Sequence, residues 1–496
     1  MLGNMRKVFG KKRLSVFHVC VGVVLLLLLI KYFLPIVRFG SVPLGYDAGI
    51  YRYLFVQYEA AFPFVPRLPD WAREHPPGLF LVSTVLMQFG VPVEWFTGWL
   101  WNVSIIALGC VLAWISVKRW GQGVGVMTLF AVFLSQAYYD GFAVMYWKTY
   151  IALLFTVLAF YFLEKKSLWS VVAIACVLLT HHQTSLLLLL VLGTWTLRWY
   201  RREIVVQKAQ ELYVLAKRRG CMRIEYIAFA LLLLGVGAFY YLPVIHEAVF
   251  RHVPTVLKLW DAPGGSFPEP LFYVRLTGVL LLFGVIGFVR SFKKEQGNLW
   301  QIAVLWSAIF VVFHLMFYRR FYLQLDFFLL PFAGMGMWWA WQTFASVSVR
   351  VGLAALLLLQ AAITFHAAWE REPYIHQDAF AFVEKLPSIL EEGATVFTLD
   401  DRSAILLRGW LPFHHVGGPG LFESRWSYQE WETFILGLPE ERKELFGSID
   451  DPFYIFISPY ALMYYGQQLE HLLKDPCLQP AHEKYLLRSI CSAKHS

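Results

Sequence analysis

The run Val23-Val24-Leu25-Leu26-Leu27-Leu28-Leu29-Ile30 lies inside an apolar stretch that extends from residue 14 to residue 37. This stretch is longer than the roughly 20 residues that a helix needs to cross the hydrocarbon core of a bilayer. It follows a basic N-terminus and has no small-residue cleavage site after it, so it predicts a retained first membrane span and not a signal peptide. Similar runs, such as residues 186–192, recur along the first three quarters of the chain.

The composition supports a membrane protein. Of the 496 residues, 58% are hydrophobic and 16% are charged, whereas an ordinary soluble domain has about 25% charged residues. A disordered, collagen-like or simply soluble protein is therefore excluded. The formal net charge of +9 comes from basic residues in short loops between apolar segments, which is a topology signal and not a nucleic-acid-binding surface.

We predict an α-helical polytopic protein with about eleven membrane spans and no nucleic-acid partner. Lys and Arg number 21 in the alternate loops that include the N-terminus and 10 in the other loops, which places the N-terminus in the cytoplasm. An odd number of spans then places the C-terminal tail outside a cell membrane. The expected spans are residues 14–37, 95–117, 122–138, 149–163, 168–181, 184–198, 225–244, 271–289, 299–317, 321–343 and 350–368.

The first outer loop is predicted to be folded. Residues 78–90 are apolar but too short to cross a bilayer, so we interpret them as an interfacial helix. Ile50, Tyr53, Leu54, Tyr58 and Ala61 have helical spacing, which predicts a second, amphipathic helix in the same loop.

The tail has a globular composition, so we divide the chain into a transmembrane domain, residues 1–369, and an extracytoplasmic α/β domain, residues 370–496. Helices are expected at residues 377–391 and 460–473, and strands at residues 394–399 and 453–458. Cys477 and Cys491 are the only cysteines in the tail and are expected to be paired or close together. No Cys/His spacing typical of a metal site is present.

Asp47 is the first candidate for chemistry. It follows the first span and precedes the amphipathic helix, so one interpretation is a helix N-cap and the other is a general base at the mouth of a membrane cavity. The two roles are compatible. Further polar residues gather on the same outer side, and ionisable groups at a membrane usually face a cavity. The candidates for binding a phosphate or substrate are Arg52, Arg73, His75, Lys148, His181, His182, Arg319 and Arg320.

Each of these motifs also has a structural interpretation. His75 precedes two prolines that can start a helix. Adjacent residues on a helix point about 100° apart, so we expect one of His181 and His182 to pack or cap and the other to reach the cavity. Arg319 and Arg320 can anchor a span end, or they can bind phosphate through their planar guanidinium groups. The sequence contains no Walker loop, GxGxxG, GxSxG or HExxH motif.

Together these features resemble the GT-C superfamily of integral-membrane glycosyltransferases. The resemblance rests on the early Asp in the first outer loop, His75-Pro76-Pro77, Thr180-His181-His182, and Arg320-Phe321-Tyr322 followed by Pro331. Several members of the superfamily carry a second acidic residue between the third and fourth spans, but the comparable stretch here contains Lys148. A second carboxylate and a bound divalent metal are therefore not supported, and no cofactor is expected.

The resemblance implies transfer of a sugar from a polyprenyl-phosphate donor to a hydroxyl of a glycan, lipid or protein acceptor, as in cell-envelope glycan synthesis. Asp47 takes the position of the catalytic carboxylate and the transfer inverts the anomeric carbon. The resemblance also implies that Arg73, His75, Arg319 and Arg320 surround the donor phosphate. The alternative is a non-enzymatic transporter or assembly subunit for lipid-linked glycans that binds only the phosphate headgroup. The absence of evident inverted repeats disfavours a transporter.

Overall fold

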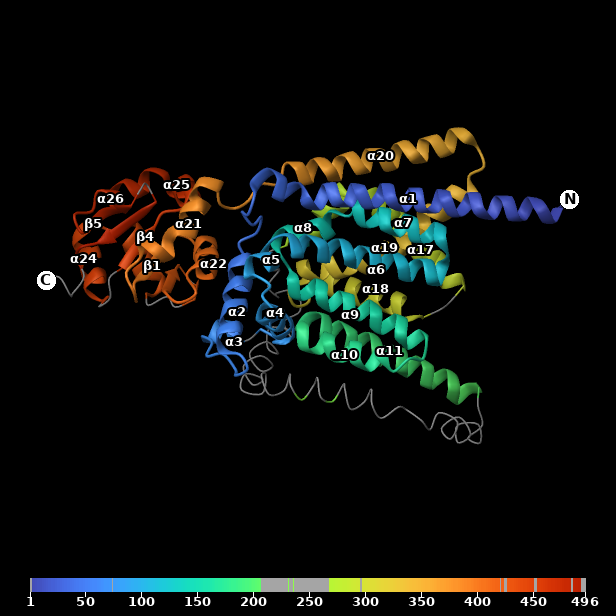
Figure 1. The fold of residues 1–496 in the computed structure, drawn as a ribbon, viewed down its shortest axis with the longest axis horizontal. Coiled ribbons are helices and arrows are strands. Elements are labelled where there is room, and N and C mark those ends of the chain that lie inside the picture. Colours follow the sequence, from blue (N-terminus) through green and yellow to red (C-terminus); the bar gives the residue numbers. More distant parts are fainter. Residues whose placement is uncertain are drawn as a thin grey trace. The chain divides into compact units, whose positions relative to one another are not determined.

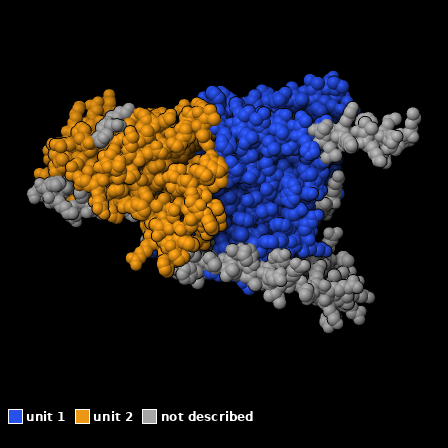
Figure 2. Space-filling model, in the orientation of Figure 1, with its two compact units in different colours: residues 1–34, 73–79, 101–371 blue, residues 35–72, 80–100, 372–496 orange. Residues whose placement is uncertain are grey.

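The computed structural model describes residues 2–73, 75–206, 231, 235, 267–294, 297–419, 421–422, 426–449, 453–482 and 485–491. These residues form two compact units, which are coloured separately in Figure 2. Unit 1 contains Met1–Leu34, Arg73–Leu79 and Trp101–Arg371. Unit 2 contains Pro35–Ala72, Phe80–Leu100 and Glu372–Ser496. Most of the first loop therefore belongs to the same unit as the tail.

Unit 1 is a bundle of helices (Figure 1). The long helix α19 is at its centre and packs against α7, α17 and α18, while α9 packs against α10. Most of the side chains that α19 buries are apolar, and their burial is the main driving force for packing such a helix. The helices are α1 (Leu2–Phe39, which continues into unit 2), α6 (Trp99–Trp120), α7 (Gln122–Leu134), α8 (Gln136–Val144), α9 (Trp147–Glu164), α10 (Trp169–Thr180), α11 (His182–Val206), α16 (Pro270–Leu276), α17 (Gly278–Lys294), α18 (Leu299–Val312), α19 (Tyr318–Thr343) and α20 (Val347–Trp369).

Helices occupy ten of the eleven expected spans, and in the remaining one, residues 225–244, only residues 231 and 235 are among the described residues. Among the described helices, four are long and apolar enough to cross a membrane, and the bent pair α16–α17 gives a fifth. The count of eleven spans is therefore not confirmed. The chain is an integral membrane protein.

The expected span at residues 122–138 is interrupted. Helix α7 ends at Leu134, and Ser135 starts α8 by accepting a hydrogen bond from the backbone N–H of Tyr138. The side-chain oxygen of a serine can replace a helical partner in this way, so it permits a break inside an apolar stretch. A second break separates α16 from α17, which are bent by 96°.

In unit 2, the two expected helices of the first loop are present as α2 (Ala48–Ala61) and α4 (Gly78–Gln88, whose first two residues belong to unit 1). The buried face of α2 is aromatic: Tyr58 stacks on Phe80 with ring centroids 5.3 Å apart, and Phe55 lies 5.1 Å from Phe96. Two short helices complete the loop, α3 (Asp70–Arg73) and α5 (Val93–Thr97).

The tail forms a six-stranded mixed sheet with helices, whereas the sequence predicts an α/β domain with only two of these strands. The strand order is β3-β2-β1-β4-β6-β5; β1 is parallel to β2 and β4, and the remaining neighbours are antiparallel. The strands are β1 (Thr395–Thr398), β2 (His415–Gly418), β3 (Leu421–Phe422), β4 (Phe453–Phe456), β5 (Leu478–His482) and β6 (Leu486–Ser489). The helices are α21 (Gln377–Ile389), α22 (Asp401–Trp410), α23 (Tyr428–Leu436), α24 (Pro439–Gly447), α25 (Pro459–Tyr465), a 3-10 turn at Gly466–Gln468, and α26 (Leu469–Leu473).

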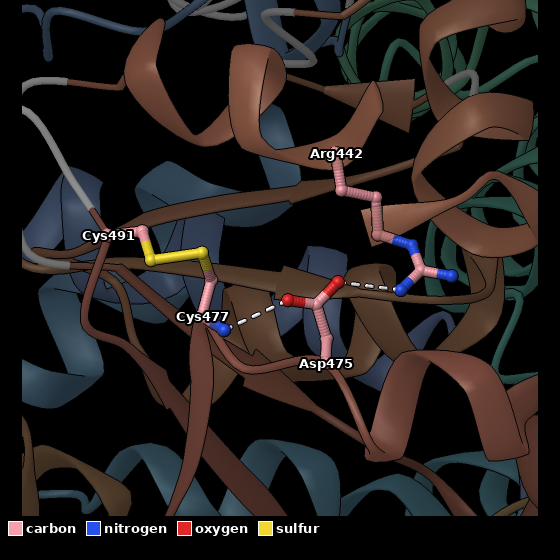
Figure 3. Close-up of a disulfide and its surroundings, with 4 residues drawn as sticks. All are labelled: Arg442, Asp475, Cys477 and Cys491. Atoms are coloured by element: carbon pink, nitrogen blue, oxygen red, sulfur yellow. Dashed lines mark hydrogen bonds and ion pairs between the residues drawn. A yellow bond between two sulfur atoms is a disulfide. The ribbon is translucent and has the colours of Figure 1, made fainter. Parts of the chain in front are cut away.

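Cys477 and Cys491 are joined by a disulfide at the edge of this sheet (Figure 3). Beside it, Asp475 accepts a hydrogen bond from the backbone N–H of Cys477 at 2.9 Å and forms an ion pair with Arg442 at 2.7 Å. Both charged side chains are fully buried. A buried pair of this kind requires both partners, because the loss of either one leaves an uncompensated charge.

Candidate functional site

A group of basic side chains in unit 1 forms the candidate site. His75 precedes α4, and its Nδ1 lies 2.8 Å from Nζ of Lys148 in the first turn of α9. The segment around His75 lies close to α10, since a Cβ on Gly78 would be 2.6 Å from the carbonyl oxygen of Leu179. His75, in the loop before α4, and Lys148, at the start of α9, therefore meet although they are 73 residues apart in the chain.

The charged groups that act most strongly on His75 are basic. Burial lowers the pKa of His75 well below its usual range, and the charges of Lys148, His182, Arg320 and His181 lower it further. A neutral imidazole beside these groups gains a proton most readily when an anion binds nearby. We name these five residues, His75, Lys148, His181, His182 and Arg320, the cationic cluster.

His181 connects two helices of the cluster. Its Nδ1 lies 2.8 Å from Oγ1 of Thr184 and accepts from the backbone N–H of Thr184 at 3.4 Å, so the side chain caps the start of α11. Its Nε2 lies 3.4 Å from Oγ1 of Thr149 on α9. The expectation that one histidine of this pair caps a helix agrees with this geometry. His182 is the first residue of α11 and acts electrostatically on His75.

The adjacent arginines at the start of α19 have different surroundings. Arg320 lies over the ring of Tyr146, 5.4 Å from the centroid, and acts electrostatically on His75 and His181. Arg319 forms an ion pair with Glu269 and donates to the hydroxyl of Tyr318. The structure thus places Arg320 in the cluster, while Arg319 is engaged with an acidic residue.

The cluster brings together the starts of three helices, α9, α11 and α19. The N-terminus of a helix carries a partial positive charge and favours anions. Lysine or arginine in the first turn adds charge of the same sign to this dipole. The arrangement is therefore suited to an anionic group such as a phosphate.

The other expected site residues are in different surroundings. Arg73 is exposed at the end of α3, two residues before His75. Arg52, in unit 2, pairs with Glu94 at 2.9 Å and donates to the carbonyl oxygen of Gly409 at 2.6 Å. Its guanidinium also lies over the ring of Trp410. Through these contacts Arg52 links α2 to Glu94 of α5 and to the end of α22.

Asp47 stands at the start of α2 in unit 2. Its backbone carbonyl accepts from the N–H of Tyr51 at 3.2 Å, but its carboxylate makes no capping hydrogen bond with the helix. The N-cap interpretation therefore does not account for this side chain. The helix itself is fixed by a close crossing, since a Cβ on Gly49 would lie 1.9 Å from the carbonyl oxygen of Ile405 in α22.

The residue before Asp47 is held by an arginine. The guanidinium of Arg402 lies 5.7 Å from the ring centroid of Tyr46 and 5.5 Å from that of Tyr374. The hydroxyl of Tyr374 donates to Asp400 at 2.7 Å, and burial together with this carboxylate raises the pKa of Tyr374. These contacts connect the turn that carries Asp47 to the carboxyl end of β1.

The sequence reasoning missed a lysine inside unit 1. Lys31, within the first apolar span, is fully buried and donates to the carbonyl oxygen of Phe133 at 2.7 Å. It interacts electrostatically with Asp140 and Asp326. A lysine in an otherwise apolar run was the available signal, because a charge inside a membrane is costly unless it has partners.

The two carboxylates near Lys31 are hydrogen-bonded. Asp326 accepts from the hydroxyl of Ser135 at 2.6 Å, and Asp140 accepts from Tyr273 at 2.9 Å and from Gln136 at 2.8 Å. We name Lys31, Ser135, Asp140, Tyr273 and Asp326 the buried network. In the part of the chain that the structure describes, no group of three or more His, Cys, Asp or Glu side chains is arranged to hold a metal ion.

Comparisons with known proteins identify the fold. No family model and no curated protein sequence matches the chain. Among solved structures, ArnT from Cupriavidus metallidurans bound to undecaprenyl phosphate aligns with a TM-score of 0.56 at 13% identity, over 96% of this chain and 98% of that chain. The apo structure of the same ArnT gives 0.53 at 13% identity, over 97% and 98%. The chain therefore shares the fold of ArnT, and the resemblance expected from the sequence is confirmed at the level of the fold.

Proposed function

We propose that this membrane protein of GT-C fold is a glycosyltransferase that transfers a sugar from a polyprenyl-phosphate donor to an acceptor hydroxyl. The observation that carries the proposal is the cationic cluster at the starts of α9, α11 and α19. The ArnT structure that contains undecaprenyl phosphate supports the choice of a lipid phosphate as the anion.

The cluster would act on the leaving group. Lys148, Arg320 and His182 bind the phosphate of the donor, and His75 accepts a proton as the phosphate approaches. When the bond between the anomeric carbon and the phosphate oxygen breaks, negative charge grows on the departing polyprenyl phosphate. Positive groups placed in advance stabilise this charge and lower the barrier.

Asp47 would act on the acceptor. Its carboxylate removes the proton of the acceptor hydroxyl while the hydroxyl oxygen forms a bond to the anomeric carbon. The attack occurs opposite the departing phosphate, so the configuration of the anomeric carbon inverts. A positioned general base typically contributes about 10²- to 10⁴-fold to a rate.

The test compares Asp47→Asn with Asp401→Asn, a matched change at an exposed carboxylate of unit 2. The purified full chain is assayed with a panel of undecaprenyl-phosphate-linked sugars and a total envelope extract as acceptor. We expect transfer with one donor, a loss of about 10²- to 10⁴-fold in Asp47→Asn at unchanged undecaprenyl phosphate binding, and little change in Asp401→Asn.

Two results would contradict the proposal. Near-normal turnover by a stable Asp47→Asn variant would show that Asp47 is not the general base. The absence of transfer with every donor, combined with movement of a lipid-linked sugar across vesicle membranes, would favour the transporter.

A further inference from the structure

A second basic region of unit 1 lies at the C-terminal end of α9, the helix that carries Lys148 of the cluster in its first turn. A cavity of about 390 Å³ is lined by Lys118, Arg119, Tyr161, Glu164, Lys165 and Trp195, and by the first residues of α18. Lys118 and Arg119 are in the last turn of α6, and Lys165 directly follows α9. None of these residues belongs to the cationic cluster.

Helix geometry separates the cavity from the cluster by most of the thickness of the hydrocarbon core of a bilayer. Lys148 begins α9 and Lys165 follows its end, so a rise of 1.5 Å per residue places them about 26 Å apart. Along α11, His182 and Trp195 are separated by about 20 Å. The hydrocarbon core of a bilayer is about 30 Å thick. The cavity therefore lies near the membrane surface opposite the cluster.

The cavity has an excess of positive charge. Arg119 forms an ion pair with Glu164, so these two charges offset one another. The side-chain ammonium groups of Lys118 and Lys165 make neither an ion pair nor a hydrogen bond with any residue that the structure describes, and Nζ of Lys165 lies 6.0 Å from the ring centroid of Tyr161. Two ammonium groups therefore remain to attract an anion into the cavity.

The position and the aromatic lining indicate which anion fits. Tryptophan and tyrosine are enriched at the level of lipid headgroups, and Trp195 and Tyr161 line the cavity. Basic pockets between membrane helices on the cytoplasmic side bind the headgroups of anionic lipids. The expected topology places the cavity on that side.

We propose that this cavity binds the headgroup of an anionic glycerophospholipid, with its phosphate between Lys118 and Lys165 and its acyl chains along the bundle. The binding is independent of the proposed sugar transfer and of the cationic cluster. It anchors the ends of α6 and α9 at the membrane surface away from the donor site.

The test is lipid binding to the purified full chain in detergent, measured by native mass spectrometry with dioleoylphosphatidylglycerol and dioleoylphosphatidylcholine. We expect preferential binding of phosphatidylglycerol, weakened about 10- to 30-fold in the double variant Lys118→Gln/Lys165→Gln. The matched control is Lys166→Gln/Lys293→Gln, which removes the same charge from exposed residues outside the cavity. This control should stay within about twofold of the wild type.

Further binding measurements with single variants and competing ligands identify the ligand of the cavity. Each single variant, Lys118→Gln and Lys165→Gln, should lose part of the affinity, so the test does not depend on the double variant alone. Equal weakening in both double variants would show diffuse surface attraction and overturn the proposal. Binding of sn-glycerol 3-phosphate as tight as that of phosphatidylglycerol would indicate a site for a soluble phosphate. Displacement of phosphatidylglycerol by a lower concentration of undecaprenyl phosphate would assign the cavity to the polyprenyl lipid.

Discussion

The buried network and the cationic cluster are both polar regions of unit 1, but their charges are balanced differently. In the network, Lys31 interacts with the carboxylates of Asp140 and Asp326, which also accept hydrogen bonds from hydroxyl groups. In the cluster, the charged groups that act on His75 and His181 are all basic. A membrane bundle can use opposite charges to hold its helices together and charges of one sign to attract a ligand. The first arrangement serves stability and the second serves binding.

The largest expected effect is on the stability of the network. Lys31→Met removes the hydrogen bond of the buried ammonium to the carbonyl oxygen of Phe133 and the cation that acts on the two buried carboxylates, so we expect the free energy of unfolding to fall by about 1.5–3 kcal/mol. Chemical denaturation of the purified variant in detergent measures this loss. Undecaprenyl phosphate affinity of the folded fraction should remain close to that of the wild type.

A double variant serves as the control for this interpretation. Lys31→Met/Asp326→Asn removes a charge of each sign, so its loss of stability should be smaller than the sum of the two single losses. Strictly additive losses would show that the two residues act independently, and would contradict the description of the network as a charge-balanced unit.

The opposite pattern is expected in the cluster. Lys148→Met removes a cation that faces other basic groups, so the free energy of unfolding should change by less than about 1 kcal/mol. The affinity for undecaprenyl phosphate should fall about 10- to 100-fold, because a charge-assisted contact to the phosphate is lost. Titration with the lipid and denaturation of the same preparation separate the two effects. If Lys148→Met lost as much stability as Lys31→Met, the cationic cluster and the buried network would not differ in their contribution to stability, which would contradict this comparison.

The smallest expected effect is a pH dependence from His75. Its pKa in the folded protein is held well below the value of about 6.5 in the unfolded chain. As pH falls below about 6.5, the unfolded state gains a proton that the folded state does not, so stability is lost at up to about 1.4 kcal/mol per pH unit. We expect His75→Gln to lose less stability than the wild type between pH 7.5 and 5.5. Thermal unfolding at both pH values checks this, and equal losses would contradict it.

Hydrophobic patterning predicted most helices of unit 1 but not their interruptions. Apolar runs of helical length recur along the chain, so the positions of α6, α9 and α20 followed from composition alone. The break at Ser135 depends on a side chain that competes with the backbone for one hydrogen bond, and the surrounding run is as apolar as an unbroken span. Serine before a helical segment was the available signal.

The sequence analysis named all five residues of the cluster as candidates, but it did not distinguish Arg320 from Arg319. Arg319 and Arg320 are adjacent and of the same residue type, so the sequence gives no reason to assign them different roles. Their side chains diverge by about 100° on α19, which allows one to reach His75 and the other Glu269. Which one faces the cluster depends on the packing of α19, and the sequence alone does not contain this information.

The measurement that tests the central claim most directly is the affinity of the full chain for undecaprenyl phosphate in Arg320→Ala and Arg319→Ala. These variants remove the same charge from neighbouring residues at the start of one helix. We predict that Arg320→Ala weakens binding about 10- to 100-fold and that Arg319→Ala stays within about twofold of the wild type. Unchanged affinity in Arg320→Ala, or equal losses in both variants, would contradict the assignment of the cationic cluster to the donor phosphate.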